Sequence, residues 1–206
     1  MTRLIIARHG NTFNAGETPR RVGARTDIPL TTTGQEQARK LGQHLKEAGL
    51  IPSQAFSSQQ QRTRQTASLA LEAMGLSLDA TPLASLNELD YGPDENKTED
   101  DVIARLGAQA LKDWDEKAVV PRGWLVDPVA QIASWQELAR QLESDHHGET
   151  ILIVTSNGTA RFAPYITGNY DEFCRNFPIK LATGSYGLIN NTDGHWQVES
   201  WNIKPA

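Results

Sequence analysis

The sequence is poor in cysteine, in excess positive charge and in long apolar runs. Cys174 is the single cysteine among 206 residues, so no disulfide can form within the chain. Lys and Arg number 20 against 25 Asp and Glu, and the resulting formal net charge of −5 argues against a nucleic-acid-binding protein. No apolar run approaches the length of a membrane span, and the first residues lack the basic and apolar regions of a signal peptide. We therefore expect a cytoplasmic protein with neither nucleic-acid nor membrane partners; nothing in the sequence specifies an oligomeric state.

What the sequence contains instead is an alternation of short apolar runs with helical patterns. The runs predict strands at residues 3–7, 54–57, 80–86 and 150–155. Helices are expected after two capping-box patterns, formed by Thr33 with Glu36 and by Ser58 with Gln61. Polar and apolar residues alternate over 179–203, which predicts an antiparallel hairpin at the C-terminus. The fold class is therefore α/β: a three-layer αβα arrangement around a doubly wound, mainly parallel sheet.

The segment at about 93–148 breaks this alternation. It contains two helical patterns, one with Val102 and Leu106 and one with Trp135 and Leu138, and no strand pattern between them. We expect a single domain over 1–206 that carries a helical cap insertion at 93–148. The insertion is also the segment expected to determine which substrate is bound.

The stretch "LIIARHGNT" at 4–12 ends the first predicted strand with Arg8, His9 and Gly10. Ligands of doubly wound sheets bind beyond the carboxyl ends of the strands. The guanidinium of Arg8 suits phosphate oxygens, the imidazole of His9 can attack phosphorus, and Gly10 would let a ligand approach the backbone. On these residues alone, the better interpretation is structural: Arg8 pairs with a carboxylate, and His9 is a hydrogen-bonded histidine at a strand end.

Two further residues make phosphate chemistry more plausible. Arg62 lies where a strand ends and a helix begins, and a helix N-terminus already favours anions. Glu88 follows another strand end, where a general acid could reach a bound substrate. The alternatives are an ordinary solvated charge for Arg62 and an exposed loop carboxylate for Glu88.

The three motifs occur in a characteristic order. They are R-H-G at 8–10, Arg-x-x-x-Thr-Ala at 62–67 and Leu-x-Glu-x-x-Tyr-Gly at 86–92. In this order and structural context, the chain resembles the histidine phosphatase superfamily, which has the phosphoglycerate-mutase-like fold. The match extends through the core to the terminal Trp-Asn pair at 201–202 and leaves the insertion uncovered.

The resemblance implies roles for individual residues. His9 would be the nucleophile that forms a phosphohistidine, and Arg8 and Arg62 would hold the phosphate oxygens. Glu88 would protonate the leaving oxygen, and Asn14 would contact the phosphate. Enzymes of this kind need no metal and no other cofactor, and the ligand would be a small phosphorylated metabolite.

The chain departs from the family pattern after the strand at 150–155. Ser156 stands where the family usually has a second pocket histidine, so a neutral hydroxyl replaces a donor that can carry positive charge. Asn157 offers amide donors to the phosphate, although capping the next helix is at least as good an explanation for it. Arg20, Arg21 and Arg25 lie in the loop after R-H-G and could restore the charge, or could simply be solvated.

Three functions are therefore open. The first is a phosphatase that hydrolyses a small phosphomonoester through a phosphohistidine. The second is a weakly active or inactive family member that binds a phosphorylated ligand, because Ser156 replaces the second histidine. The third is a phosphoglycerate-mutase-type phosphotransferase, which is disfavoured by the short insertion and by Val22, at a position where mutases tend to place a hydroxyl.

Overall fold

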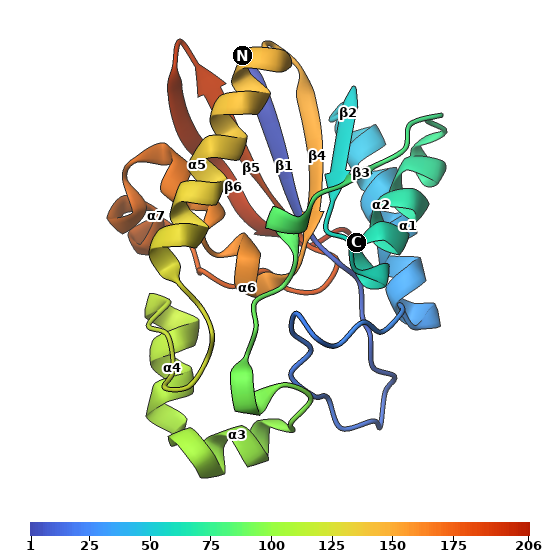
Figure 1. Cartoon of the computed structure of the whole chain (residues 1–206). Helices are drawn as coiled ribbons and strands as arrows, with labels where there is room; N and C mark the ends of the chain where they lie inside the picture. Colours follow the sequence, from blue (N-terminus) through green and yellow to red (C-terminus); the bar gives the residue numbers. More distant parts are fainter.

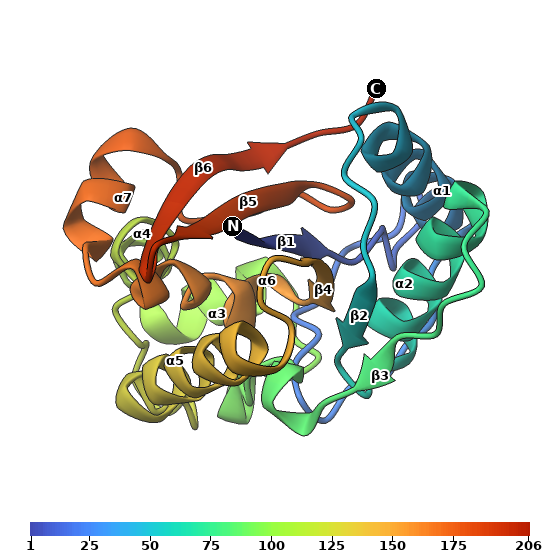
Figure 2. The ribbon, with the colours of Figure 1, turned by 90° about the horizontal axis from the view of Figure 1, so that it is seen from above.

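The protein is built around a six-stranded sheet (Figures 1 and 2). The structure, a computed structural model, describes all of residues 1–206. The strands are β1 (Thr2–Arg8), β2 (Gln54–Ser57), β3 (Thr81–Pro82), β4 (Thr150–Thr155), β5 (Tyr186–Thr192) and β6 (His195–Ile203). Their order is β3-β2-β4-β1-β5-β6, with β1 to β4 parallel and with β5 antiparallel to both β1 and β6. The predicted mainly parallel sheet with a C-terminal antiparallel hairpin is confirmed.

The central strands are apolar along their whole length because both faces of the sheet are covered. In β1, Leu4 and Ile6 pack into the core on one face, whereas Ile5 and Ala7 pack into the core on the other. None of the four is more than 1% exposed. Burying each of the large side chains stabilises the fold by about 1.5–3 kcal/mol, which explains why an uninterrupted apolar run occurs here.

One face of the sheet is covered by α1 (Thr32–Glu47) and α2 (Gln61–Met74) (Figure 2). The helices end at glycines as expected, but both predicted capping boxes are wrong. The Thr31 hydroxyl accepts from Gly34 N at the start of α1. At α2 the N-cap is Gln60, because the Ser58 hydroxyl is hydrogen-bonded to that of Thr63 instead.

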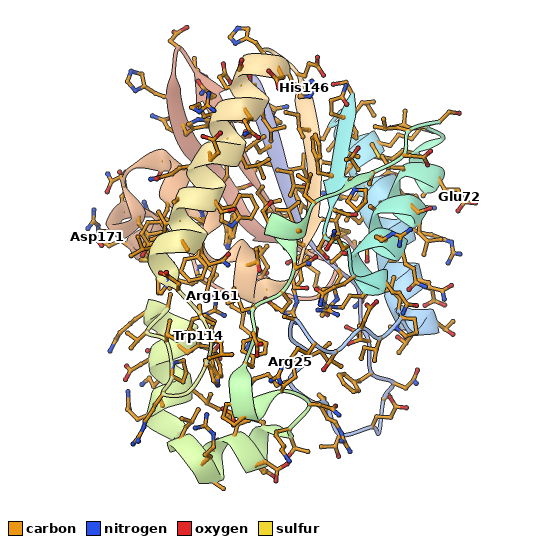
Figure 3. All side chains as sticks on the ribbon, viewed as in Figure 1. Arg25, Glu72, Trp114, His146, Arg161 and Asp171 are labelled. Carbon is orange, nitrogen blue, oxygen red and sulfur yellow. The ribbon has the colours of Figure 1, made fainter.

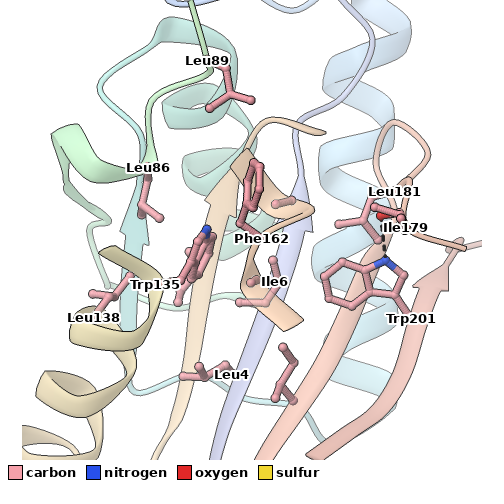
Figure 4. Close-up of a cluster of buried hydrophobic side chains, with 14 of the residues drawn as sticks. Leu4, Ile6, Leu86, Leu89, Trp135, Leu138, Phe162, Ile179, Leu181 and Trp201 are labelled. Atoms are coloured by element: carbon pink, nitrogen blue, oxygen red, sulfur yellow. Dashed lines mark hydrogen bonds between the residues drawn. The ribbon is translucent and has the colours of Figure 1, made fainter. Parts of the chain in front are cut away.

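The other face is covered by α5 (Pro128–Asp145), α6 (Asn157–Ala160), a 3₁₀ turn (Ala163–Thr167) and α7 (Tyr170–Asn176). Trp135 of α5 is buried in one cluster with Leu4, Leu138 and Phe162 (Figure 4). Its indole N–H donates to Thr159 O at 3.0 Å. Helix α5 is thus part of the layer that covers this face of the sheet, and the chain runs from it into the parallel strand β4. The predicted insertion over 93–148 therefore extends too far: its second helix packs on the sheet.

Two short helices form the cap, α3 (Glu99–Leu106) and α4 (Ala108–Lys117), which project beyond the carboxyl edge of the parallel strands (Figure 1). The single helix expected here is broken at Gly107, whose φ of 82° is left-handed. The predicted strand at 80–86 is likewise shorter, because β3 gives way to a 3₁₀ turn at Ala84–Leu86. A further 3₁₀ turn, Gly92–Asp94, leads into the cap, where Asp94 accepts from Arg105 and Trp124. None of the helices combines the length and apolarity needed to cross a membrane.

Candidate active site

A cavity of about 500 Å³ lies between the carboxyl edge of the sheet and the cap. Arg8, the last residue of β1, is in register with Thr155, the last residue of the neighbouring parallel strand β4. The residues that follow these strand ends therefore meet at one edge. Arg8, His9, Glu88 and Asn157 all line the cavity, so the structure brings together four of the predicted site residues.

His9 is held in a defined orientation. Its Nδ1 lies 2.7 Å from Gly10 O, and because a carbonyl can only accept, Nδ1 carries the hydrogen. Burial, followed by the charges of Arg8 and Arg62, lowers the pKa of His9 well below its ordinary value of 6.5. The imidazole is therefore neutral near pH 7, and the lone pair of Nε2 is free to act as a nucleophile.

Gly10 is a glycine for a reason that the sequence does not show. A Cβ at this position would lie 2.3 Å from Gly34 O, at the start of α1. Contact between the two backbone segments, rather than approach of a ligand, is therefore what requires the glycine.

Arg62 is buried and Arg8 is half-buried, and neither guanidinium forms a salt bridge with a carboxylate. Arg8 donates to Leu181 O at 2.7 Å, and Arg62 donates to Thr26 O at 3.0 Å and to the Gln60 side chain at 2.8 Å. The Nε of each arginine has no hydrogen-bond partner. Burial lowers the pKa of both groups, but an arginine stays protonated at neutral pH. Arg62 is completely buried and does not line the cavity, so it is not a solvated surface charge.

The carboxylate of Glu88 is fixed by backbone N–H groups. Its Oε1 accepts from Leu89 N at 2.9 Å and from Thr159 N at 3.1 Å, and its Oε2 accepts from Gly158 N at 3.1 Å. Gly158 makes this position possible, because a Cβ there would lie 2.3 Å from Oε1. Burial, followed by the charge of Glu88, raises the pKa of Tyr91, so its hydroxyl stays protonated. Glu88 is thus a buried, positioned carboxylate and not an exposed loop residue.

Three other predicted site residues lie in different surroundings. Ser156 is completely buried, does not line the cavity, and has no partner for its hydroxyl. Asn157 lines the cavity and accepts from Leu181 N at 2.9 Å; it is the first residue of α6, so its expected role as N-cap is wrong. Asn14 is exposed, donates to Glu17, and is not part of the cavity wall.

The loop arginines divide into two groups. Arg20 and Arg21 line the cavity, and the guanidinium of Arg21 lies 4.8 Å from the ring centre of Trp124. Arg25 instead donates to Gly92 O and pairs with Asp90 at 3.2 Å. Two of the three are therefore placed to add positive charge to the cavity.

Sequence reasoning gave no site role to Arg161 or Trp114, which both line the cavity. Figure 3 shows the two side chains where the cap meets the core. The guanidinium of Arg161 stacks on the Trp114 ring, 3.6 Å from its centre. The one local signal for Arg161 is its place five residues after Ser156, in the segment that follows β4. Nothing in the sequence pairs it with a tryptophan 47 residues earlier, because that contact depends on where α4 lies. The structure contains no group of three or more His, Cys, Asp or Glu side chains that could hold a metal ion.

Comparison with known proteins places this geometry in a family. The family model for branch 1 of the histidine phosphatase superfamily matches residues 4–204. The chain is 32% identical over 209 residues to a probable phosphoglycerate mutase, GpmB, from Erwinia tasmaniensis, covering all of this chain and 93% of that protein.

Solved structures share the fold. The mycobacterial glucosyl-3-phosphoglycerate phosphatase in complex with VO3 has a TM-score of 0.80 at 20% identity, and 98% of each chain is covered. The alpha-ribazole phosphatase from Shigella flexneri has a TM-score of 0.72 at 23% identity, covering 98% of this chain and 96% of that one. With the family model matching almost the whole chain, this protein belongs to the histidine phosphatase superfamily, whose members are phosphatases or mutases.

Proposed function

We propose that the protein is a phosphatase that hydrolyses a small phosphomonoester through a phosphohistidine on His9. The observation that carries the proposal is the state of this side chain: a neutral imidazole with a free Nε2, beside guanidinium groups that no carboxylate neutralises. A tetrahedral dianion placed against Nε2 would meet positive charge and unused N–H donors.

In the first half of the reaction, Nε2 of His9 attacks phosphorus while the bond from phosphorus to the ester oxygen breaks. Arg8, which lines the cavity, holds the non-bridging oxygens, and the charge of Arg62 behind the cavity wall helps to stabilise them in the transition state. Glu88, in its protonated form, gives its proton to the leaving oxygen, and the alcohol departs. The Nδ1–H bond to Gly10 O persists and stabilises the imidazole as it gains the phosphoryl group.

In the second half, water attacks the phosphohistidine. The Glu88 carboxylate accepts a proton from this water, the bond from phosphorus to Nε2 breaks, and inorganic phosphate is released. The backbone donors Leu89, Gly158 and Thr159 keep the carboxylate in one position for both halves. His9 returns to its neutral form, and Glu88 is protonated again for the next cycle.

The replacement of the second histidine favours a competing proposal, a weakly active protein that binds a phosphorylated ligand. Ser156 places only a buried hydroxyl without a partner near the site. The survival of His9, Arg8, Arg62 and Glu88 in a common arrangement supports activity instead. Arg20 and Arg21 supply further positive charge to the cavity wall.

A mutase is the other candidate, and the similarity over the whole chain to a protein named as a probable phosphoglycerate mutase favours it. Val22 argues against it, because this apolar side chain lines the cavity where a hydroxyl would be expected to hold the substrate. Product analysis with a phosphoglycerate separates the two activities. Release of inorganic phosphate supports the hydrolase, and an isomerised phosphoglycerate without phosphate release supports the mutase.

The test of the proposed function is turnover of a generic aryl phosphate by the wild type and by His9→Ala. The matched control is His147→Ala, since the side chain of His147 is exposed and bonds only to Glu143. We expect activity in the wild type and in the control, and none in His9→Ala. Full activity in His9→Ala would show that the nucleophile lies elsewhere, and absence of activity in the wild type would favour the binding protein.

A further inference from the structure

Trp201 and Asn202 form a β-bulge near the end of β6, and the proposed reaction uses neither residue. Together they lie opposite a single residue of β5, Gly187, whose missing side chain makes room for the Trp201 ring. Asn202 has a φ of 60°, in the left-handed region that asparagine tolerates better than most residues. A bulge re-aims side chains. Here both side chains bond to the connecting loop, residues 177–185 between α7 and β5.

The connecting loop contains neither helix nor strand, so side chains supply hydrogen bonds to its backbone. The indole N–H of Trp201 donates to Ile179 O at 3.3 Å (Figure 4). The Oδ1 of Asn202 accepts from Ala182 N at 2.7 Å, and the Ser185 hydroxyl lies 2.9 Å from the same oxygen. The position of the loop therefore depends on the two residues of the bulge.

The connecting loop in turn contacts the end of β1, where the proposed reaction takes place. Leu181 O accepts, at 2.7 Å, the one hydrogen bond that the Arg8 guanidinium makes within the protein. Ser185 O accepts from Arg8 N at 2.9 Å, and Gly184 N donates to His9 O at 3.1 Å. The direction in which the guanidinium points therefore depends on where the loop places Leu181 O.

A single peptide group joins the bulge to the arginine. The C=O of Leu181 and the N–H of Ala182 belong to the same planar unit. Asn202 binds the N–H of this unit, and Arg8 binds its C=O. A rotation of the peptide plane that breaks the first hydrogen bond also moves the acceptor of the second. The orientation set by Asn202 is thus transmitted to the guanidinium through one rigid group.

We propose that Asn202 is a positioning residue, which fixes the Arg8 guanidinium for the phosphate through the peptide between Leu181 and Ala182. The inference rests on the proposed function, in which Arg8 holds the non-bridging oxygens. Asn202 itself is not part of the cavity wall, and Trp201 assists it by holding the same loop. A misplacement of about 1 Å in a group that binds the transition state can cost about 10²-fold in rate.

A purely structural role for Asn202 would be to hold the C-terminal hairpin on the core. Such a role would lower stability and leave the phosphate affinity of the folded protein unchanged. Asn202→Gly separates the two roles, because glycine adopts a left-handed conformation without strain and the substitution removes the acceptor. The matched control is Asp193→Gly, since Asp193 is exposed and has a φ of 53° in the turn at the other end of the same hairpin.

The experiment measures affinity for inorganic phosphate by calorimetry and kcat/KM for an aryl phosphate, both at a temperature where every variant is folded. Asn202→Gly should weaken phosphate binding by about tenfold, the effect of one hydrogen bond to a charged group, and lower kcat/KM by about 10–10²-fold. Asn202→Asp keeps an acceptor oxygen and tolerates the left-handed conformation, so its values should lie closer to the wild type than to Asn202→Gly. Asp193→Gly should match the wild type in both measurements.

A double-mutant cycle shows whether the effect passes through Arg8. Arg8→Lys removes the planar guanidinium whose direction depends on Leu181 O. Adding Asn202→Gly to Arg8→Lys should therefore weaken phosphate binding less than Asn202→Gly does alone, as is typical of residues in one hydrogen-bond network. A structural effect would be equal in the two backgrounds.

Three results would overturn the proposal: wild-type phosphate affinity in Asn202→Gly, an equal loss with and without Arg8→Lys, or an equal loss in Asn202→Asp and Asn202→Gly. If Asn202→Gly does not fold, Trp201→Phe decides, because it removes the N–H donor to Ile179 O and keeps an aromatic ring. Unchanged phosphate affinity there would contradict a role for the bulge. Weaker phosphate binding by Asn202→Gly, in a protein whose wild type does not turn over the aryl phosphate, would support the positioning role while contradicting the proposed phosphatase activity.

Discussion

Glu88→Gln changes one atom of a side chain whose surroundings are fixed. The carboxylate accepts three backbone N–H groups, two at Oε1 and one at Oε2. Glutamine has one carbonyl oxygen, which can replace Oε1, and its amide nitrogen cannot accept a bond. Gly158 N would then lose its acceptor and face another donor.

The size of the effect follows from this count. A buried donor left without a partner costs about 1–3 kcal/mol, so Glu88→Gln should lower the free energy of unfolding by about that amount. In a domain of this length, the melting temperature should fall by about 2–12 °C. Thermal and urea unfolding measure the change. Glu47→Gln is the control, because Glu47 is exposed near the end of α1 and should change stability by less than about 0.5 kcal/mol.

Activity provides the second readout. Loss of the general acid should reduce kcat by about 10²–10⁴-fold, while affinity for inorganic phosphate changes far less. Asp90→Asn is the comparison, since Asp90 bonds to Gly92 N and pairs with Arg25. Equal damage from Asp90→Asn would assign the acid role to that residue. Unchanged stability in Glu88→Gln would refute the three-donor geometry, and unchanged kcat would refute the proposed role.

Three further predictions concern His9, Ser156 and the absence of a metal requirement. An NMR titration should place the pKa of His9 well below 6.5. The unfolded chain takes up this proton near pH 6.5 and the folded chain does not, so the free energy of unfolding should fall as the pH drops below 6.5. The fall should be less steep in His9→Ala. A His9 midpoint at or above 6.5 would contradict this. Ser156→His should leave kcat unchanged or lower it, because the Ser156 side chain is completely buried and a larger ring would have to fit there. A gain in kcat on the order of 10²-fold, as expected from one pre-organised donor, would instead indicate a decayed active site. EDTA should leave aryl phosphate turnover unchanged, whereas a large loss restored by a divalent ion would show that a metal takes part.

The sheet and the centre of the site were predictable because their signals are local. An apolar run with no polar alternation predicts a strand covered on both faces, and β1 and β4 are such strands. The position of His9 and Arg8 follows from the end of β1. The C-terminal hairpin was likewise predictable, because alternation and the Asp193-Gly194 turn lie next to each other in the chain.

The missed features depend on contacts between distant segments. The periodicity of α5 shows that it has an apolar face, but not that this face covers the sheet instead of the cap. Helix starts were misplaced because several hydroxyls near Thr31 and Ser58 could serve as caps, and the local hydrogen bonds that form in the folded chain decide among them. Arg161 was overlooked because its environment is created by Trp114 of the cap. Local sequence thus placed Arg8 and His9 at the end of a central strand, whereas the contact between Arg161 and the cap became visible only in the structure.

The most direct test of the central claim is to trap the covalent intermediate. The wild type is mixed rapidly with a phosphate ester labelled in the phosphoryl group, quenched in base, and digested to locate the label. The account predicts an acid-labile phosphoryl group on His9 that forms and decays within the time of turnover and is absent from His9→Ala. Turnover without any trapped adduct, or an adduct on another residue, would contradict the account.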